Sequence, residues 1–253
     1  MRGYVHGWDD DLELAINDYE SAAKIDRKFQ DFTQGARYNF VDKDYKKAIE
    51  LFNKVIQNKV LLFIVYNLRG NCYYETGEFQ KAIADHTEAI KLNSDFYGNY
   101  INRANAYNQT GQFDRAIADC NKSISINPNN FYGYHTRGVA YAFMEEYSKA
   151  ITDINQAIKL DPNKIDAYGN RAFCNYRLEN YLEAIYDYTK VLELHSSTKE
   201  ISFNEYIFLA HSYLMLKEYD KASADIDMVL KLDPGNENAL YVRGEIRAAR
   251  AAQ

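Results

Sequence analysis

The sequence is short of cysteine and of long apolar runs, and each shortage excludes a class of protein. Its three cysteines are far apart and odd in number, which fits a reducing compartment better than a disulfide framework. No stretch approaches the roughly 18 uninterrupted apolar residues of a membrane-spanning helix. The start, MRGYVHGWDDDLEL, lacks the apolar segment of a signal peptide. We therefore expect a cytoplasmic protein without a membrane span.

Basic charge and catalytic motifs are also scarce. Lysine and arginine number 30 against 36 aspartates and glutamates, a net charge of −6, whereas binding a nucleic-acid backbone requires clustered basic residues. The sequence contains no glycine-rich phosphate loop, no Cys-x-x-Cys pair and no His-Glu-x-x-His motif. His135 and His211 have no acidic residue or cysteine at metal-ligand spacing. We expect no enzyme activity, no cofactor, no metal and no nucleic-acid partner.

What the sequence does contain is a repeated phrase. TGEFQKAIADHTEAIKL begins at Thr76 and returns as TGQFDRAIADCNKSISI at Thr110. Its alanine recurs, in steps of 34 residues with a last step of 38, at Ala48, Ala82, Ala116, Ala150, Ala184 and Ala222. An aromatic residue precedes each alanine by three positions: Tyr45, Phe79, Phe113, Tyr147, Tyr181 and Tyr219. A small residue precedes it by twelve: Ala36, Gly70, Ala104, Gly138, Ala172 and Ala210.

The spacing inside one copy predicts a pair of helices. In the fourth copy, Tyr134, Gly138 and Tyr141 are spaced as one face of a helix. A second helix follows around Ala150, and Pro162 stands where that helix must end. A bulky side chain in place of Gly138 would overpack the crossing of the two helices. Each copy is thus a helical hairpin that buries its apolar face only by stacking on its neighbours.

These residues resemble the tetratricopeptide repeat family, whose period is 34 residues. The fourth copy matches the family pattern at Tyr134, Gly138, Tyr141, Ala150, Ala157 and Pro162, and all three prolines (Pro128, Pro162 and Pro234) take its closing position. The resemblance implies an all-α protein, a right-handed α-solenoid of stacked antiparallel helix hairpins. We expect an N-terminal extension with a capping helix at 1–28, repeats at 29–62, 63–96, 97–130, 131–164, 165–198 and 203–236, and a C-terminal capping helix at 237–253.

Two further features of the repeats need an interpretation. Four extra residues near Lys199–Ser202 precede the sixth repeat, and the polar run HSSTKE predicts a longer loop there. Arginines recur at Arg69, Arg103, Arg137 and Arg171, with aspartates sixteen residues later at Asp85, Asp119, Asp153 and Asp187. They form either a charged ligand site or structural ion pairs, and we favour ion pairs because buried charges are normally paired. Pairing within one repeat or between neighbours, as Asp225 with Arg243 suggests, stays open.

The first-helix positions opposite the core are the candidate binding surface, and in the family they line a concave groove that takes peptides or helices of partner proteins. Repeats two and three carry an asparagine-rich strip suited to hydrogen-bonding a peptide: Asn67, Asn71, Tyr74, Asn102, Asn105 and Asn108. Repeats four to six carry an aromatic and aliphatic strip: Tyr132, His135, Phe143, Phe173, Tyr176, Arg177, His211 and Met215. The alternative is that Phe143, Tyr176 and Met215 pack against adjacent first helices.

The sequence therefore predicts a protein-interaction scaffold with a protein or peptide partner. The family subtype that clamps a terminal carboxylate is not supported, because its positions hold Thr33, Arg37, Leu68, Gly98 and Asn102. Two alternatives are a structural protein that self-assembles through its ends and an RNA-binding helical repeat, which the acidic balance opposes. The N-terminal Tyr4–Trp8 segment is a candidate occupant of the groove when no partner is bound.

Overall fold

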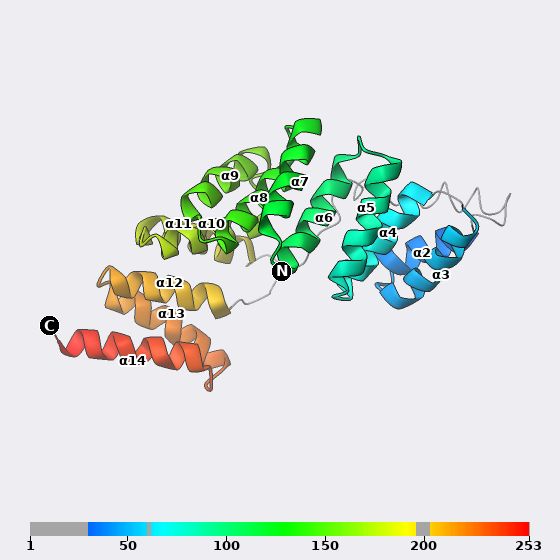
Figure 1. Cartoon of the computed structure of the whole chain (residues 1–253). Coiled ribbons are helices and arrows are strands. Elements are labelled where there is room, and N and C mark those ends of the chain that lie inside the picture. The colour runs from blue at the N-terminus through cyan, green and yellow to red at the C-terminus, as the bar shows by residue number, and fades with distance from the viewer. Residues whose placement is uncertain (1–29, 60–61, 196–202, 253) are drawn as a thin grey trace. The chain divides into compact units, whose positions relative to one another are not determined.

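The computed structural model describes residues 30–59, 62–195 and 203–252, and all regular structure in these ranges is helical. The chain divides into two compact units, unit 1 at residues 1–140 and unit 2 at residues 141–253. Each unit is a stack of antiparallel helix hairpins (Figure 1), so the expected all-α solenoid of paired helices is confirmed. No helix of the described ranges is long and apolar enough to cross a membrane.

The described part of unit 1 contains three complete hairpins, in which each second helix packs on its own first helix, and the second helices of the first two hairpins also pack on the first helix of the next repeat. Its helices are α2 (Gln30–Phe40), α3 (Tyr45–Gln57), α4 (Leu62–Glu75), α5 (Phe79–Leu92), α6 (Tyr97–Gln109), α7 (Phe113–Ile126) and the beginning of α8 (Phe131–Phe143). The first helices α2, α4 and α6 also contact one another in sequence. They therefore form one face of the unit.

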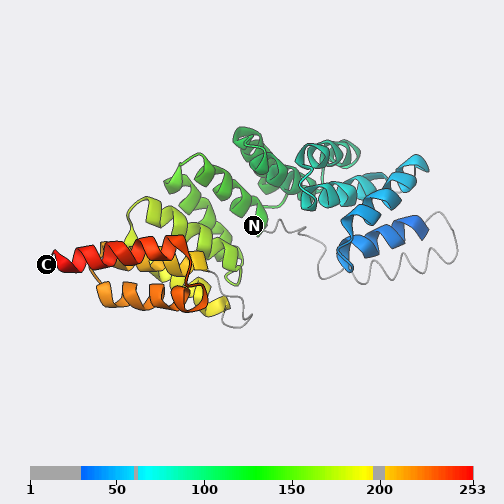
Figure 2. The ribbon, with the colours of Figure 1, turned by 90° about the horizontal axis from the view of Figure 1, so that it is seen from below.

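Unit 2 repeats this arrangement with the end of α8 and six further helices. These are α9 (Tyr147–Leu160), α10 (Ile165–Arg177), α11 (Tyr181–His195), α12 (Phe203–Met215), α13 (Tyr219–Leu232) and α14 (Glu237–Ala251). Here α10, α12 and α14 contact one another as neighbouring first helices. Figure 2 shows α13 and α14, in orange and red, side by side at the C-terminal end.

The repeated small residues lie where the helices cross, as the sequence predicts. The six alanines from Ala48 to Ala222 are fully buried, and each second helix begins at its repeated aromatic residue. In the second repeat, a Cβ added to Gly70 would lie 2.8 Å from Cε1 of His86. Only a residue without a side chain allows this approach, because real Cβ contacts are longer.

Each hairpin turn places one residue in the left-handed region of backbone space, always at the same position of the repeat. These residues are Lys43, Gly77, Gly111, Glu145, Glu179 and Lys217, with φ between 55° and 78°. Two of the six are glycine, the residue that adopts this conformation without steric cost. The other four repeats therefore form the turn with a side chain that the local conformation disfavours.

The second helices end at turns closed by a side chain. Asn93, Asn127 and Asp161 each accept a hydrogen bond from the backbone N–H two residues later, at 3.2, 3.2 and 3.0 Å. This Asx turn reverses the chain, and Pro128 and Pro162 follow because they cannot continue a helix. An Asx residue, followed by proline in two of these three repeats, therefore marks the end of the second helix.

Several expectations fall outside the described residues or stay predictions. The N-terminal capping helix around Leu12–Asp26, the Tyr4–Trp8 segment and the loop at Lys199–Ser202 lie outside the described ranges. α11 ends at His195 and α12 begins at Phe203, and Asn236 caps α14 by accepting from the backbone N–H of Ala239 at 3.1 Å. The boundaries chosen for the six repeats remain predictions.

Candidate functional site

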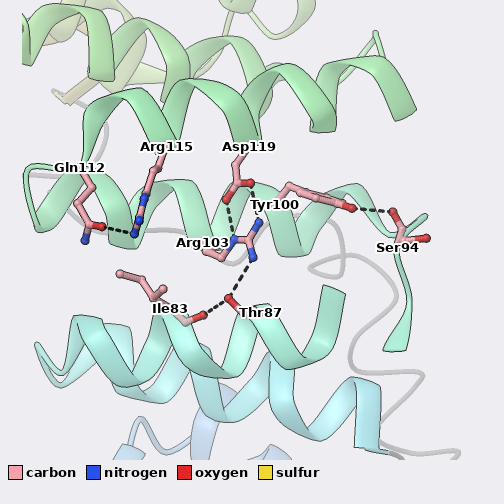
Figure 3. A network of polar contacts seen from close by, with 8 residues as sticks. All are labelled: Ile83, Thr87, Ser94, Tyr100, Arg103, Gln112, Arg115 and Asp119. Carbon is pink, nitrogen blue, oxygen red and sulfur yellow. Dashed lines mark hydrogen bonds and ion pairs between the residues drawn. The ribbon is translucent and has the colours of Figure 1, made fainter. Parts of the chain in front are cut away.

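The repeated arginines bridge three helices. In the third repeat, Arg103 on α6 donates to both carboxylate oxygens of Asp119 on α7, each at 2.7 Å, and to Thr87 Oγ1 on α5 at 3.0 Å (Figure 3). Thr87 in turn donates to the backbone oxygen of Ile83 at 2.7 Å. One guanidinium therefore joins its own hairpin and fastens that hairpin to the preceding one, an arrangement called an arginine bridge below.

The same bridge occurs in both units. Arg69 donates twice to Asp85, at 2.7 Å each, and to Asn53 at 2.5 Å. In unit 2, Arg171 donates to Asp187 at 2.7 and 2.6 Å and to Asn155 at 2.6 Å. Each of these arginines therefore pairs with the aspartate of its own repeat. The half-buried guanidinium donates two parallel hydrogen bonds to the carboxylate and a third to the preceding repeat. The structural interpretation of these charges holds for these three pairs.

Sequence reasoning missed the third partner of the bridge, although a signal was present. Asn53, Thr87, Asn121 and Asn155 lie 34 residues apart, sixteen before the arginines, and each accepts a hydrogen bond from the following repeat's arginine. The sequence shows these small polar residues as a repeated position, like the repeated arginines and aspartates. These side chains form the hydrogen bonds by which each arginine contacts the preceding repeat.

The sixth repeat lacks this bridge. Leu209 replaces the arginine, is buried, and packs with Ala172, Ala184 and Tyr188. Oδ2 of Asp225 is buried and has no hydrogen-bond partner among the described residues, so the pairing of Asp225 with Arg243 is not formed through that oxygen. Burial raises the pKa of Asp225 to about 6. At this position, apolar contacts of Leu209 join repeat six to repeat five instead.

In unit 1, the expected asparagine strip forms a chain of amides. Asn102 donates to Asn71 at 3.1 Å, and Asn71 donates to Asn67 at 3.4 Å. Asn67 in turn donates to Asn99, a residue the sequence reasoning did not single out. All four are buried, so their mutual bonds link α4 to α6. Each amide offers up to four hydrogen-bonding positions, so this chain leaves some of their capacity unused.

Three of the other candidates of unit 1 contact the neighbouring first helix, and two lie against an aromatic ring of their own helix. Asn105 accepts a hydrogen bond from Thr136 Oγ1 at 3.1 Å, and buried Asn108 donates to the backbone oxygen of Thr136 at 3.3 Å. The Tyr74 hydroxyl accepts from Gln109 at 3.3 Å. Half-buried Tyr132 and His135 both lie against the ring of Phe131, with centroids 4.9 and 5.2 Å away.

In unit 2, Phe208 on α12 is the centre of an aromatic cluster that the sequence reasoning did not find. Its ring centroid lies 5.1 Å from that of Tyr176, 6.1 Å from that of Phe173 and 5.8 Å from that of Tyr188. Phe173 also contacts Tyr147 at 6.3 Å. Phe173 and Tyr176 are therefore half-buried packing residues of the junction between repeats five and six as well as candidate ligand contacts.

Charged and polar groups border this cluster. Arg177 lies 3.6 Å from the carboxylate of Glu145 and stacks over the Tyr147 ring at 5.0 Å. Nδ1 of His211 is 3.1 Å from the Tyr176 hydroxyl, and its Nε2 is 3.8 Å from Glu245. Burial is the main cause that raises the pKa of Tyr176.

Phe143 and Met215, by contrast, lie largely in solvent. They are the last residues of α8 and α12, and they are 46% and 48% exposed. They are the two apolar members of the predicted strip that the structure leaves exposed, which makes them candidates for contact with a partner.

Three cysteines and one histidine are buried within the repeats. Cys72, Cys120 and Cys174 are buried, and burial raises the pKa of the Cys174 thiol to about 12. His86 is fully buried with both ring nitrogens unpaired, and burial lowers its pKa to about 3. No cluster of three or more potential metal ligands occurs in the ranges that the structure describes.

Comparison with known proteins identifies the repeats. The tetratricopeptide repeat family matches residues 63–96, 100–130 and 131–164. Heat shock protein STI1 of Saccharomyces cerevisiae is 34% identical over 71 residues, which are 28% of this chain and 12% of that protein. The chain therefore matches a small part of that relative's length.

Solved structures with the same fold cover most of the chain. A tetratricopeptide repeat protein from Parabacteroides merdae is 23% identical, with a TM-score of 0.65 and 88% of each chain covered. PilF of Pseudomonas aeruginosa is 13% identical, with a TM-score of 0.72 over 86% of this chain and 97% of its own. YrrB, described as a protein of this class with an unusual peptide-binding site, is 19% identical with a TM-score of 0.60, covering 76% and 97%.

Proposed function

The chain is a tetratricopeptide repeat protein, and we propose that it binds a peptide or helix of a partner protein on the first-helix face of unit 2. Proteins built from these repeats are interaction scaffolds, and the repeat fold is typically non-catalytic. The observation that carries the proposal is the exposure of Phe143 and Met215 at the ends of the first helices α8 and α12, together with the half-buried Phe173 and Tyr176 on the first helix α10.

The chemistry of this surface favours an apolar anchor in the partner. Aromatic side chains that become desolvated on binding are the usual energetic centre of an interface. Arg177 and Glu145 neutralise each other at its edge, and His211 and Tyr176 share a contact, so no strong charge of one sign selects the ligand. We expect a partner segment with aliphatic or aromatic residues spaced to meet first helices of successive repeats.

Unit 1 contributes a different chemistry. The buried amides of Asn67, Asn71 and Asn102 already bond to one another, so a ligand there would use only their remaining hydrogen-bonding positions. We propose that Asn105 and Tyr74, which are less buried, are the side chains of unit 1 with which a bound chain would form hydrogen bonds.

The fold of YrrB, whose printed description mentions a peptide-binding site, is a precedent for this use of stacked first helices. At 19% identity the likeness concerns the fold, so the ligand of that protein is not transferred. The match to STI1 is limited to 71 residues and adds no ligand either. The proposal therefore rests on the surface of this chain.

The test truncates the two exposed apolar side chains of this face. We would change Phe143→Ser together with Met215→Ser and compare recovery of partner proteins from native lysate by quantitative mass spectrometry. A matched control is Leu232→Ser, since Leu232 is similarly exposed but lies on the second helix α13. Loss of two apolar anchors should lower recovery at least about tenfold, with the control unchanged. Equal recovery by the double variant and the parent would refute the proposal.

A further inference from the structure

The second helix of repeat five carries an exposed apolar pair at two positions where the other repeats have polar or small residues. Leu182 and Tyr186 on α11 are 68% and 67% exposed, among the most exposed large apolar side chains of the described residues. They are one helical turn apart, so they form a continuous ridge. The corresponding positions hold Lys46, Gln80, Asp114, Ser148 and Asp220, and Glu50, Ala84, Ala118, Thr152 and Ala224.

The fold does not explain these two residues. α11 packs through its opposite face on α10 and α12, where Ala184, Tyr188 and Val191 are buried. The five other repeats stack with polar or small residues at the same places, so stacking does not require Leu182 or Tyr186. This ridge lies on the second-helix side and is separate from the first-helix surface proposed above for peptide binding.

We propose that this ridge is a contact between two copies of the chain, in which two α11 helices pack antiparallel about a two-fold axis at Tyr186. Opposite charges beside the ridge favour this arrangement. Glu183 and Lys190 are seven residues, or two turns, apart and flank the ridge on the same side. Tyr186 lies midway between them along the helix.

An antiparallel two-fold arrangement places equivalent flanks of the two helices together. Glu183 of one copy then faces Lys190 of the other, and the contact occurs twice. Lys190 already meets Glu193 of its own helix at 3.3 Å, but an ammonium group has three donors and can bind a second carboxylate. In a parallel two-fold arrangement opposite flanks meet, so Glu183 and Lys190 would not face one another; only the antiparallel arrangement pairs them.

The contact is small. Two such side chains contribute roughly 300 Å² per copy, compared with about 800 Å² per partner in a stable complex. We therefore expect reversible association with a dissociation constant on the order of 100 µM, strengthened where other contacts hold two copies close. The ridge acts as a secondary contact and does not make an obligate dimer.

The first test follows the mass of the full chain by sedimentation equilibrium from about 5 µM to about 1 mM. The weight-average mass should rise from 29.4 kDa toward twice that value. A variant with Leu182→Ser and Tyr186→Thr, which copies repeat four, should remain monomeric, and Leu232→Ser should associate as the parent does. A parent that stays monomeric, or a double variant that still associates, overturns the proposal.

The second test addresses the antiparallel arrangement. Glu183→Lys alone and Lys190→Glu alone each place like charges opposite one another, so each should weaken self-association at least about fivefold. An equimolar mixture of the two variants restores both charge pairs and should associate as well as the parent at low salt. A mixture as weak as its components would exclude this arrangement of the two helices.

Discussion

Arg171 holds Asp187 through two parallel hydrogen bonds of 2.7 and 2.6 Å while its third nitrogen reaches Asn155 in the preceding hairpin. Asp187 is almost completely buried and Arg171 is half-buried, so the pair is shielded from solvent on one side. Removing one member of such a pair leaves the other charge buried without compensation. The stability of the stack should therefore be sensitive to substitutions in the arginine bridge.

We expect Asp187→Asn to destabilise the protein strongly. The amide has nearly the size of the carboxylate but no charge, and it turns one of the two acceptors into a donor facing Arg171. The expected loss is about 2–4 kcal/mol in the free energy of unfolding, measured as a lower urea midpoint by circular dichroism.

The control for this measurement is an ion pair on the surface of the protein. Arg250 and Asp220 lie 2.6 Å apart, but Asp220 is entirely exposed. Exposed pairs contribute little, so Asp220→Asn should leave the midpoint unchanged. If both substitutions had the same effect, the bridge would not be what stabilises the hairpin.

Asp225 should behave in the opposite way, because its arginine has been replaced by Leu209. A pKa raised from 3.8 to about 6 means that the folded state prefers the protonated carboxyl. The contribution of Asp225 to stability is then present below pH 3.8 and is lost as the pH rises through about 6. Solvent screening of this partly exposed group reduces the penalty at neutral pH to about 1–2 kcal/mol.

Asp225→Asn should therefore stabilise unit 2 at neutral pH. We expect a higher urea midpoint than the parent at about pH 7.5 and no difference below about pH 4. A gain of the same size at both pH values would mean that the amide acts through packing or helix propensity. Lower stability at neutral pH would show that Asp225 has a partner in solution.

The turn residue Glu179 offers a test of local backbone strain. It has φ of 61° at a position where two other repeats carry glycine. Glu179→Gly removes the steric cost of the left-handed conformation but makes the unfolded chain more flexible, leaving a net gain of about 0.5–1 kcal/mol. Thermal unfolding of the variant checks this, and Gly111→Glu should shift the melting temperature in the opposite direction.

The repeats made the hairpin architecture predictable, because every repeat must bury the same face. Periodic positions such as Ala150 and Gly138 therefore reveal the core without any knowledge of contacts. The contacts of the side chains on the first-helix face were less predictable. Tyr176 was expected to point away from the packing, yet it lies against Phe208 and His211 of the next first helix.

The reason is that the first-helix face is also a contact between repeats. A helical wheel divides one helix into a core side and a free side, but it does not show how much of the free side the next first helix covers. The same limit applies to Asn67 and Asn71, whose amides bond along and between helices. Phe143 and Met215, the last residues of their helices, stay exposed.

The buried ring of His86 makes the stability of unit 1 sensitive to acid. Both ring nitrogens lack partners, and burial, with a smaller effect from Arg103, lowers the pKa of this histidine from 6.5 to about 3. In the unfolded chain the ring takes up a proton near pH 6.5, whereas the folded protein resists protonation. The stability that neutral His86 provides is therefore present above pH 6.5 and is lost as the pH falls toward 3.

His86→Phe should remove this dependence. Phe52 occupies the equivalent position in the first repeat, where a Cβ added to Gly35 would meet its ring at 2.8 Å, so a phenyl ring against a glycine backbone is already used in this stack. We expect the urea midpoint of the parent to fall between about pH 7 and pH 5 by the equivalent of about 2 kcal/mol, and that of the variant to fall much less. His135→Phe, on the half-buried first-helix face, is the matched control and should retain the parent's slope. If His86→Phe and the parent lost stability in parallel over this range, acid sensitivity would have to arise from groups other than His86.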